Sequence, residues 1–394
     1  MGVAFATRVE LLKASEIREI LKITARPEVI SFAGGLPAPE VFPVQELKQA
    51  AIRVLDEAGS QALQYSTTEG YEPLRRQISQ RIDAKFAVKV GPENILITSG
   101  SQQALDFAGK LFLDAGDVVL CESPTYLAAI SAFRAYQPRF VEVPTDDDGM
   151  VIEELAKILR STERVKFIYV VPDFQNPSGR TWSVERRRQF AALIEEFEMP
   201  VVEDNPYGEL RYEGQIPPSI KSFDTTGLVI FVSTFSKIFC PGMRIGWIAA
   251  AANFFDKFVL IKQGADLHTS SISQREIDKY FELYDIDAHV QKIIEVYRRR
   301  RDAMLTSIDE LFPAGVKHTY PQGGLFTWVE LPAGYKSVEL LKRCLERNVA
   351  FVPGDSFFPN GRVENTLRLN FSNMSEERIR EGIGRLAQVI KEYK

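Results

Sequence analysis

The segment Leu228-Val229-Ile230-Phe231-Val232-Ser233-Thr234-Phe235-Ser236-Lys237 begins as an unbroken apolar run and ends in hydroxyl groups and a lysine. Apolar residues occupy successive positions instead of every second one, which is typical of a strand that is covered on both faces of a sheet. We therefore expect a buried strand here, with Lys237 just beyond its carboxyl end.

Similar runs occur on the amino-terminal side of this segment. They span 94–98, 118–121, 165–171 and 200–203, and helix-length stretches separate them, the first beginning near Ser101. Strands that alternate with helices form right-handed βαβ units and a mainly parallel sheet. We therefore predict an α/β fold with a mainly parallel sheet of the seven-stranded type, flanked by helices. Ligands bind at the carboxyl ends of the strands in such sheets.

The chain has 394 residues, which exceeds the usual size of one hydrophobic core. We predict a large domain over residues 50–283. The remaining parts are 1–49, which includes the N-terminal segment, and 284–394, and together they should form a smaller α/β domain. We expect an amphipathic helix at Glu10–Thr24 and a long helix after Tyr284. Two strands should follow, at Leu325–Leu331 and Thr366–Phe371, and then a final helix after Ser375.

Composition excludes several classes of protein. The net charge of −5 disfavours nucleic acid, which requires a basic face. No apolar run is long enough to cross a bilayer, and the three histidines lack metal-ligand spacing, so neither a membrane partner nor a metal is expected. Three widely spaced cysteines indicate reduced thiols and a cytoplasmic protein.

Lys237 is the first candidate for chemistry. A lysine that loses hydration at the end of a buried strand is a better nucleophile, because burial disfavours its charged form. The alternative is a surface lysine, which would be preferred for a lone residue. Hydroxyls at Thr234 and Ser236 and the guanidinium of Arg244 supply an anion-binding environment, which favours function. A Ser-x-x-Lys nucleophile is excluded because Thr234 occupies the serine position.

Other candidates also follow apolar runs, and each has a structural alternative. The turn Thr98–Gln103 could bind phosphate at a helix start, or Ser101 could simply cap that helix. Asp204 could pair with a protonated ring nitrogen or serve as a turn acid. Asn176 could bind a phenolic oxygen or only form a turn, and Tyr126 could stack on a ring or pack in the core. Arg368 interrupts an apolar strand, which suits a carboxylate ligand or a structural ion pair.

The order of these motifs resembles that of fold-type I, class I/II aminotransferases, and the resemblance spans the chain. It is strongest to the branch of 2-aminoadipate, kynurenine and archaeal aromatic aminotransferases. The motifs that carry it are Ser31-Phe32-Ala33-Gly34-Gly35-Leu36-Pro37, Gln64-Tyr65-Ser66, Ser99-Gly100-Ser101-Gln102-Gln103, Gln175-Asn176-Pro177-Ser178-Gly179, Glu203-Asp204-Asn205-Pro206-Tyr207, Ser233-Thr234-Phe235-Ser236-Lys237 and Asn365-Thr366-Leu367-Arg368-Leu369.

The resemblance implies pyridoxal 5′-phosphate as the cofactor and assigns roles to these residues. Lys237 would hold the cofactor covalently and shuttle a proton, with Asp204 on the pyridine nitrogen. Asn176 and Tyr207 would hold the phenolic oxygen, and Tyr126 would stack on the ring. The phosphate ligands would be Gly100, Ser101, Gln102, Thr234, Ser236, Arg244 and, from the neighbouring subunit of a homodimer with shared sites, Tyr65. Arg368 would bind the substrate α-carboxylate, with Gly35 and Asn176 nearby. Asp173 stands where relatives often have Asn or Ser, and the resemblance implies no role for it.

The expected activity is transfer of an amino group from an aromatic, branched or 2-aminoadipate donor to 2-oxoglutarate, with ping-pong kinetics. Arg18 would meet a side-chain carboxylate, or it is a solvated helix residue. A β-lyase or decarboxylase on the same scaffold is the alternative, because both reactions begin in the same way. A ligand-sensing regulator is a remote alternative, since such regulators carry a DNA-binding domain that about thirty residues before Ser31 cannot form.

Overall fold

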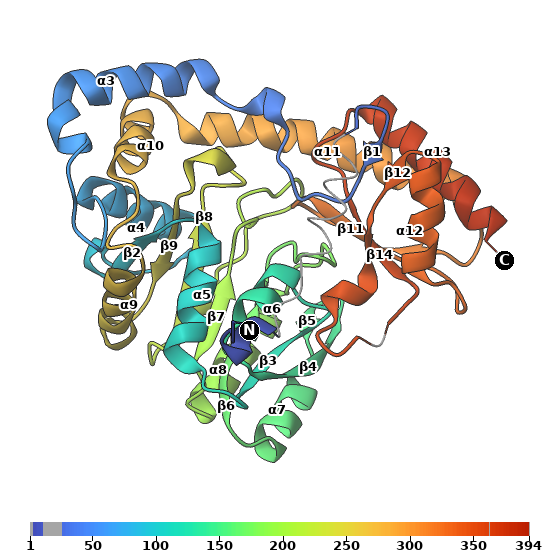
Figure 1. Cartoon of the computed structure of the whole chain (residues 1–394), viewed down its shortest axis with the longest axis horizontal. Coiled ribbons are helices and arrows are strands. Elements are labelled where there is room, and N and C mark those ends of the chain that lie inside the picture. Colours follow the sequence, from blue (N-terminus) through green and yellow to red (C-terminus); the bar gives the residue numbers. More distant parts are fainter. Residues whose placement is uncertain (1–2, 11–25, 362, 394) are drawn as a thin grey trace.

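The computed structural model describes residues 3–10, 26–361 and 363–393. Its largest element is a sheet of eight strands in the order β2-β9-β8-β7-β6-β3-β4-β5 (Figure 1). The strands are β2 (Ile95–Thr98), β3 (Val118–Ser123), β4 (Arg139–Asp146), β5 (Gly149–Met150), β6 (Val165–Val170), β7 (Val201–Asp204), β8 (Val229–Thr234) and β9 (Gly246–Ala249). The pairs between β4, β3, β6, β7 and β8 are parallel, so the prediction of a mainly parallel α/β sheet is confirmed.

Two features of the sheet were not expected. Strand β9 runs antiparallel between β2 and β8, and β5 is a two-residue strand that pairs back onto β4. With β5 the sheet has one strand more than the predicted seven.

Both faces of the sheet are buried, which explains why its strands read as continuous apolar runs. Val118 and Leu120 belong to one apolar cluster, whereas Val119 between them belongs to a second. Because successive side chains of a strand point to opposite faces, the two clusters lie on opposite sides of the sheet. Helices α7 (Ile152–Ser161) and α8 (Val184–Glu196) contribute to the first cluster, and α5 (Ser101–Phe112) and α6 (Leu127–Arg134) to the second.

A smaller antiparallel sheet is formed mainly by the C-terminal part of the chain. Its order is β10-β11-β14-β13, with β10 (Lys317–His318), β11 (Phe326–Glu330), β13 (Val352–Pro353) and β14 (Thr366–Asn370). Helices α12 (Ser337–Glu346) and α13 (Glu376–Glu392) pack against each other beside it (Figure 1). Strand β1 (Ile30–Ser31) pairs with β12 (Val349–Ala350), which brings the N-terminal segment to this part of the molecule.

The remaining helices surround or connect the two sheets. Helix α11 (Ile286–Leu311) runs from the large sheet to the C-terminal part (Figure 1). The others are α1 (Thr7–Glu10), α3 (Val44–Ala62), α4 (Glu72–Phe86), α9 (Ala252–Ala265) and α10 (Ser271–Leu283). Most of the expected helix at Glu10–Thr24, including Arg18, lies outside the described residues. None of the described helices has the length and apolar composition needed to cross a bilayer.

Candidate active site

Lys237 lies just beyond the carboxyl end of β8. The hydroxyl of Thr234 stabilises this turn, because it donates to the carbonyl of Ile245 at 2.8 Å and accepts from the backbone N–H of Ser236 at 3.1 Å. The Lys237 amine donates to the carbonyl of Gly35 at 2.9 Å. Burial, reinforced by the charges of Arg368 and Arg244, lowers the pKa of the amine to about 8. At pH 7 about a tenth of the amine is therefore uncharged and nucleophilic, far more than for an exposed lysine.

Asp204 is the last residue of β7 and is almost completely buried. Tyr169 donates its hydroxyl to Oδ2 at 2.8 Å, whereas Oδ1 has no hydrogen-bond partner among the described residues. Burial raises the pKa of this carboxyl to about 7, although the bond from Tyr169 opposes the rise. A buried carboxylate with an unused oxygen can accept a hydrogen bond from a cationic N–H group, and the positive charge would lower the pKa of the carboxylate again.

Asn176 and Tyr207 lie on the loops that follow β6 and β7. The amide nitrogen of Asn176 is 3.5 Å from the Tyr207 hydroxyl, so both can donate to one acceptor oxygen between them. Burial raises the pKa of Tyr207, which keeps the phenol protonated and able to donate. Tyr126, at the start of α6, lines the same cavity, and burial raises its pKa to about 12.

Arg368 comes from the centre of β14, where it is paired opposite Trp328 of β11. Its Nη1 donates to Asn176 Oδ1 at 2.7 Å, and its Nη2 donates to the carbonyl of Ala33. The guanidinium lies 4.2 Å from the ring centre of Phe326, and its Nε has no partner among the described residues. Burial lowers its pKa to about 10, so it stays charged at neutral pH and can bind a carboxylate.

The start of α5 forms the anion-binding end of the site. Gly100 precedes the helix with φ of 76°, and a Cβ there would lie 2.3 Å from Nη2 of Arg244. Arg244 in turn donates to the carbonyl of Ser99 at 3.2 Å. Unpaired N–H groups, the helix dipole and a guanidinium at one place suit a phosphate.

These residues surround two adjoining cavities of about 180 and 380 Å³. The smaller is lined by Ser101, Gln102, Tyr126, Val171, Asn176, Asp204, Pro206, Tyr207, Thr234, Ser236, Lys237, Pro241 and Arg244. The larger is lined by Gly35, Gln102, Tyr126, Leu127, Ala128, Ser131, Asn176, Tyr207, Lys237, Phe326 and Arg368. Among the described residues, every predicted site residue except Gly100 and Tyr65 therefore lines a cavity, and Gly100 directly precedes Ser101.

Tyr65 is the predicted residue that lies away from both cavities. Its side chain is 80% exposed, and its ring packs edge-on against His268 with 5.9 Å between the ring centres. This position differs from that of the other predicted phosphate ligands. Among the described residues, no group of His, Cys, Asp or Glu side chains could hold a metal ion.

Two contributors to the site were missed from the sequence. Tyr169 lies within β6 and donates to Asp204, and Phe326 of β11 lies under Arg368. Both read as ordinary apolar strand residues. The single polar atom of Tyr169 was the signal available, since a buried tyrosine hydroxyl requires a partner.

A nucleophilic lysine, a buried carboxylate and an anion-binding helix start around one cavity are the features of a lysine-dependent enzyme on an α/β sheet. The class I and II aminotransferase family model matches residues 28–386, and the chain belongs to this family. It is an aminotransferase, as the sequence predicted, with the expected fold.

Three relatives illustrate the similarity. The chain is 47% identical to aromatic-amino-acid aminotransferase 1 of Thermococcus litoralis, over 98% of this chain and 94% of that protein. The crystal structure of Pyrococcus horikoshii kynurenine aminotransferase, in complex with PMP and with kynurenine as substrate, matches with a TM-score of 0.94 and 43% identity, covering 98% and 97% of the two chains. The α-aminoadipate aminotransferase of Thermus thermophilus, complexed with N-(5′-phosphopyridoxyl)-L-leucine, matches with a TM-score of 0.92 and 42% identity, with the same coverage. The expected cofactor, pyridoxal 5′-phosphate, agrees with the PMP and the phosphopyridoxyl group that these two structures hold.

Proposed function

We propose that this protein is a pyridoxal 5′-phosphate-dependent aminotransferase that moves the amino group of an L-amino acid to 2-oxoglutarate by a ping-pong mechanism. The observation that carries the proposal is the set of groups around the two cavities. Lys237 lines both cavities. Asp204 offers to one of them an oxygen that has no partner in the described parts of the chain, and Arg368 offers a charged guanidinium to the other. Both 2-oxo acids and amino acids carry the carboxylate that Arg368 would bind, which allows the two half-reactions to share one site.

The residues fit the cofactor at each of its polar groups. The phosphate would lie among Gly100, Ser101, Gln102, Thr234, Ser236 and Arg244. Asp204 would face the ring nitrogen, Asn176 and Tyr207 would donate to the phenolic oxygen, and Tyr126 would cover one face of the ring. When bound, pyridoxal phosphate withdraws electrons from the substrate Cα and makes its proton acidic.

Lys237 would then act as general base and acid. Its pKa of about 8 lies close to the operating pH, which is the condition for efficient proton transfer in both directions. Arg368 would orient the substrate through its α-carboxylate, with Gly35 and Asn176 beside it, and so place the Cα proton near the lysine amine.

Aromatic, branched and 2-aminoadipate donors are proposed from the lining of the larger cavity and from the relatives. Leu127, Ala128 and Phe326 supply apolar surface there. The relatives above are named for aromatic amino acids, kynurenine and aminoadipate. Arg18 stays a proposed contact for a side-chain carboxylate, and donor profiling of Arg18→Ala would test it, because an unchanged KM for 2-aminoadipate would remove Arg18 from the substrate site.

The assembly belongs to the same proposal. We infer a homodimer in which Tyr65 reaches the phosphate of the neighbouring subunit, because this side chain is exposed and lies outside the cavities of its own chain. We also infer that residues 50–283 form a cofactor-binding domain and that 1–49 and 284–394 form a smaller one. A cytoplasmic location is proposed from the three cysteines, none of which is in a disulfide.

An absorption spectrum of the purified holoenzyme, before and after addition of glutamate, tests the function. A visible band that is lost as glutamate is converted to 2-oxoglutarate supports transamination, and addition of a 2-oxo acid should restore the band. The Lys237→Ala variant should lack the band of a lysine-bound cofactor. Release of ammonia without any 2-oxo acid acceptor would instead indicate a β-lyase and overturn the proposal.

A further inference from the structure

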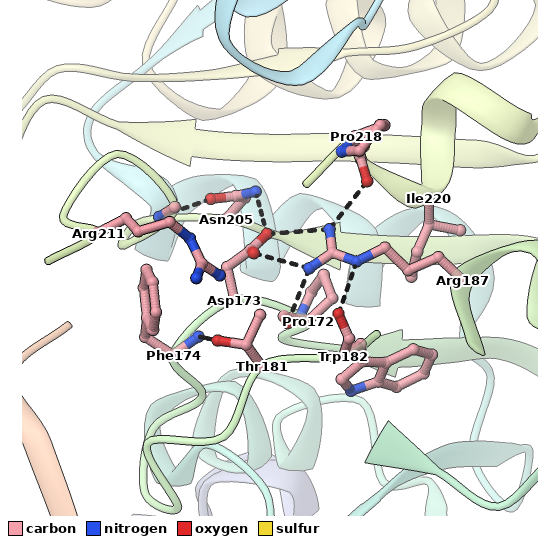
Figure 2. Close-up of polar contacts among 12 residues, drawn as sticks. Pro172, Asp173, Phe174, Thr181, Trp182, Arg187, Asn205, Arg211, Pro218 and Ile220 are labelled. Atoms are coloured by element: carbon pink, nitrogen blue, oxygen red, sulfur yellow. Dashed lines mark hydrogen bonds and ion pairs between the residues drawn. The ribbon is translucent and has the colours of Figure 1, made fainter. Parts of the chain in front are cut away.

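A buried ion pair outside the cavities joins Asp173 to Arg187. Both side chains are completely buried, and Nη2 of Arg187 lies 2.7 Å from Oδ1 of Asp173. A second bond, from Nη1 to Oδ2 at 3.2 Å, makes the pair bidentate. Asp173 follows β6, whereas Arg187 lies on α8, so the pair joins the end of a central strand to the next helix. Figure 2 shows the guanidinium facing the carboxylate edge to edge.

All five N–H donors of Arg187 are used. Besides the two bonds to Asp173, Nε donates to the carbonyl of Trp182 at 3.2 Å, Nη1 to that of Pro218 at 3.1 Å, and Nη2 to that of Pro172 at 3.1 Å (Figure 2). Burying two charges costs several kcal/mol per ion unless further hydrogen bonds compensate. Here those bonds go to backbone carbonyls of separate segments, so the guanidinium fixes the positions of these segments relative to one another.

Asp173 makes a third contact, to the loop after β7. The amide nitrogen of Asn205 donates to Oδ2 of Asp173 at 2.9 Å, on the side away from the shorter Arg187 bond (Figure 2). The Asn205 amide oxygen accepts from the backbone N–H of Gly208 at 2.9 Å, and its carbonyl accepts from the hydroxyl of Ser233 at 2.6 Å. Through Asn205, the ion pair is therefore connected to the loop after β7 and to strand β8.

The connected loops carry the residues that face the proposed cofactor. Asp173 lies three positions before Asn176, and Asn205 lies between Asp204 and Tyr207. Asp204 is proposed to face the ring nitrogen, whereas Asn176 and Tyr207 are proposed to face the phenolic oxygen. A change in the distance between the two loops would change both contacts at once, because these atoms lie on different edges of one rigid ring.

We propose that Asp173, Arg187 and Asn205 are positioning residues that hold the loop of Asn176 in register with the loop of Asp204 and Tyr207, and thereby set how tightly and in which protonation state the cofactor is bound. The inference rests on the proposed function, since it concerns the same cofactor. None of the three residues lines either cavity, so they act only through their neighbours.

The contacts explain why position 173 requires a carboxylate in this chain. Three donors, two from Arg187 and one from Asn205, point at its two oxygens. An asparagine has one oxygen and replaces the other with an NH2 group, which would face a donor. Asp173→Asn must therefore lose one of its two bonds from Arg187, and it also loses the bond from Asn205 if the NH2 group takes the place of Oδ2.

The experiment compares cofactor binding in variants and wild type. We expect Asp173→Asn to raise the dissociation constant of pyridoxal phosphate for the cofactor-free protein about tenfold, as for the loss of one charge-assisted hydrogen bond. The pH midpoint of the visible band of the bound cofactor should shift by about half a unit or more. With saturating cofactor, kcat should fall, because the cofactor that is bound is held in a different position.

A second variant separates positioning from folding. The double substitution Asp173→Leu with Arg187→Met replaces the pair with apolar side chains, so neither charge is left buried without its partner. Its Tm should be lower than that of the wild type, because the carbonyls of Trp182 and Pro218 lose the Arg187 donor. Well below that Tm the folded variant should still show the shifted midpoint and weaker cofactor binding.

A matched control is available at the opposite end of the sheet. Asp117 is buried beside Arg164, at 2.7 Å, just before the start of β3. Asp117→Asn should lower Tm but leave the midpoint and the cofactor dissociation constant unchanged.

Two results would overturn the inference. One is an unchanged midpoint and dissociation constant in both Asp173 variants, and the other is an equal shift in Asp117→Asn. These results differ from a failure of the proposed function, in which the wild type itself would show no lysine-bound cofactor band.

Discussion

Replacing Asp204 with asparagine should remove a large part of the pH dependence of stability in the cofactor-free protein. Burial raises the pKa of this carboxyl from 3.8 to about 7, which corresponds to about 4 kcal/mol of difference between its two protonation states. The folded chain retains the proton that the unfolded chain releases above about pH 4. The free energy of unfolding therefore falls as the pH rises toward about 7, and this contribution is constant at higher pH.

About 2.5 kcal/mol of this loss falls between pH 5 and pH 8. Urea unfolding of the cofactor-free protein, followed by tryptophan fluorescence at a fixed protein concentration, gives the free energy of unfolding at pH 5 and at pH 8. Glu122 contributes in the same direction, because burial raises its pKa to about 7, so the relevant quantity is the difference between wild type and Asp204→Asn. The asparagine keeps an acceptor for the Tyr169 hydroxyl, which makes it a conservative replacement.

The expected result is a wild type that loses about 2.5 kcal/mol more than the variant between the two pH values. Saturating pyridoxal phosphate should reduce this loss in the wild type alone, since a cationic ring nitrogen stabilises the ionised carboxylate. Equal pH dependence in the two proteins would refute the assignment of the raised pKa to Asp204.

Three further predictions concern the lysine, the arginine and the phosphate end of the site. The rate at which cofactor-free protein captures pyridoxal phosphate covalently should rise with pH to half its maximum near pH 8, following the pKa of Lys237, and Lys237→Arg should show no capture in the same absorption assay. Arg368→Lys should lower kcat/KM for amino donors about thirtyfold, because a single ammonium cannot replace a fork of charged donors, and steady-state kinetics with intact cofactor content would check it. Gly100→Ala should raise the dissociation constant of the cofactor about tenfold or more, because the new Cβ would lie 2.3 Å from Arg244 at a residue of positive φ. Gly242→Ala is the control and should bind the cofactor normally, because a Cβ at Gly242 meets nothing within 4 Å. Equal affinities of the two glycine variants in a fluorescence titration would contradict this reasoning.

The parallel strands could be predicted because they are buried on both faces. The run at Leu228–Val232 became β8 at Val229–Thr234, and that at 200–203 became β7 at Val201–Asp204. Polar residues directly after such runs must lie at one edge of the sheet, which is why Asp204 and Lys237 could be placed in one site.

Other features depend on tertiary contacts that leave no local pattern. Strand β9 is inserted antiparallel between β2 and β8, and its four residues resemble any short apolar segment. Arg187 lies in the run Arg186-Arg187-Arg188 of α8, and nothing in that run shows which of the three arginines is completely buried in an ion pair. Its partner Asp173 therefore had no role that could be inferred from the sequence.

The contacts of Arg368 also determine when the site can form during synthesis. Its guanidinium meets Ala33 across 335 positions of the chain and Asn176 across 192. Strand β7, which ends in Asp204, and strand β8, which ends just before Lys237, leave the ribosome more than a hundred residues before Arg368 does. A nascent chain can therefore fold its parallel sheet first. Arg368, the proposed ligand of the substrate carboxylate, is added only when translation is nearly complete, so the proposed substrate site can be completed only after the sheet has formed.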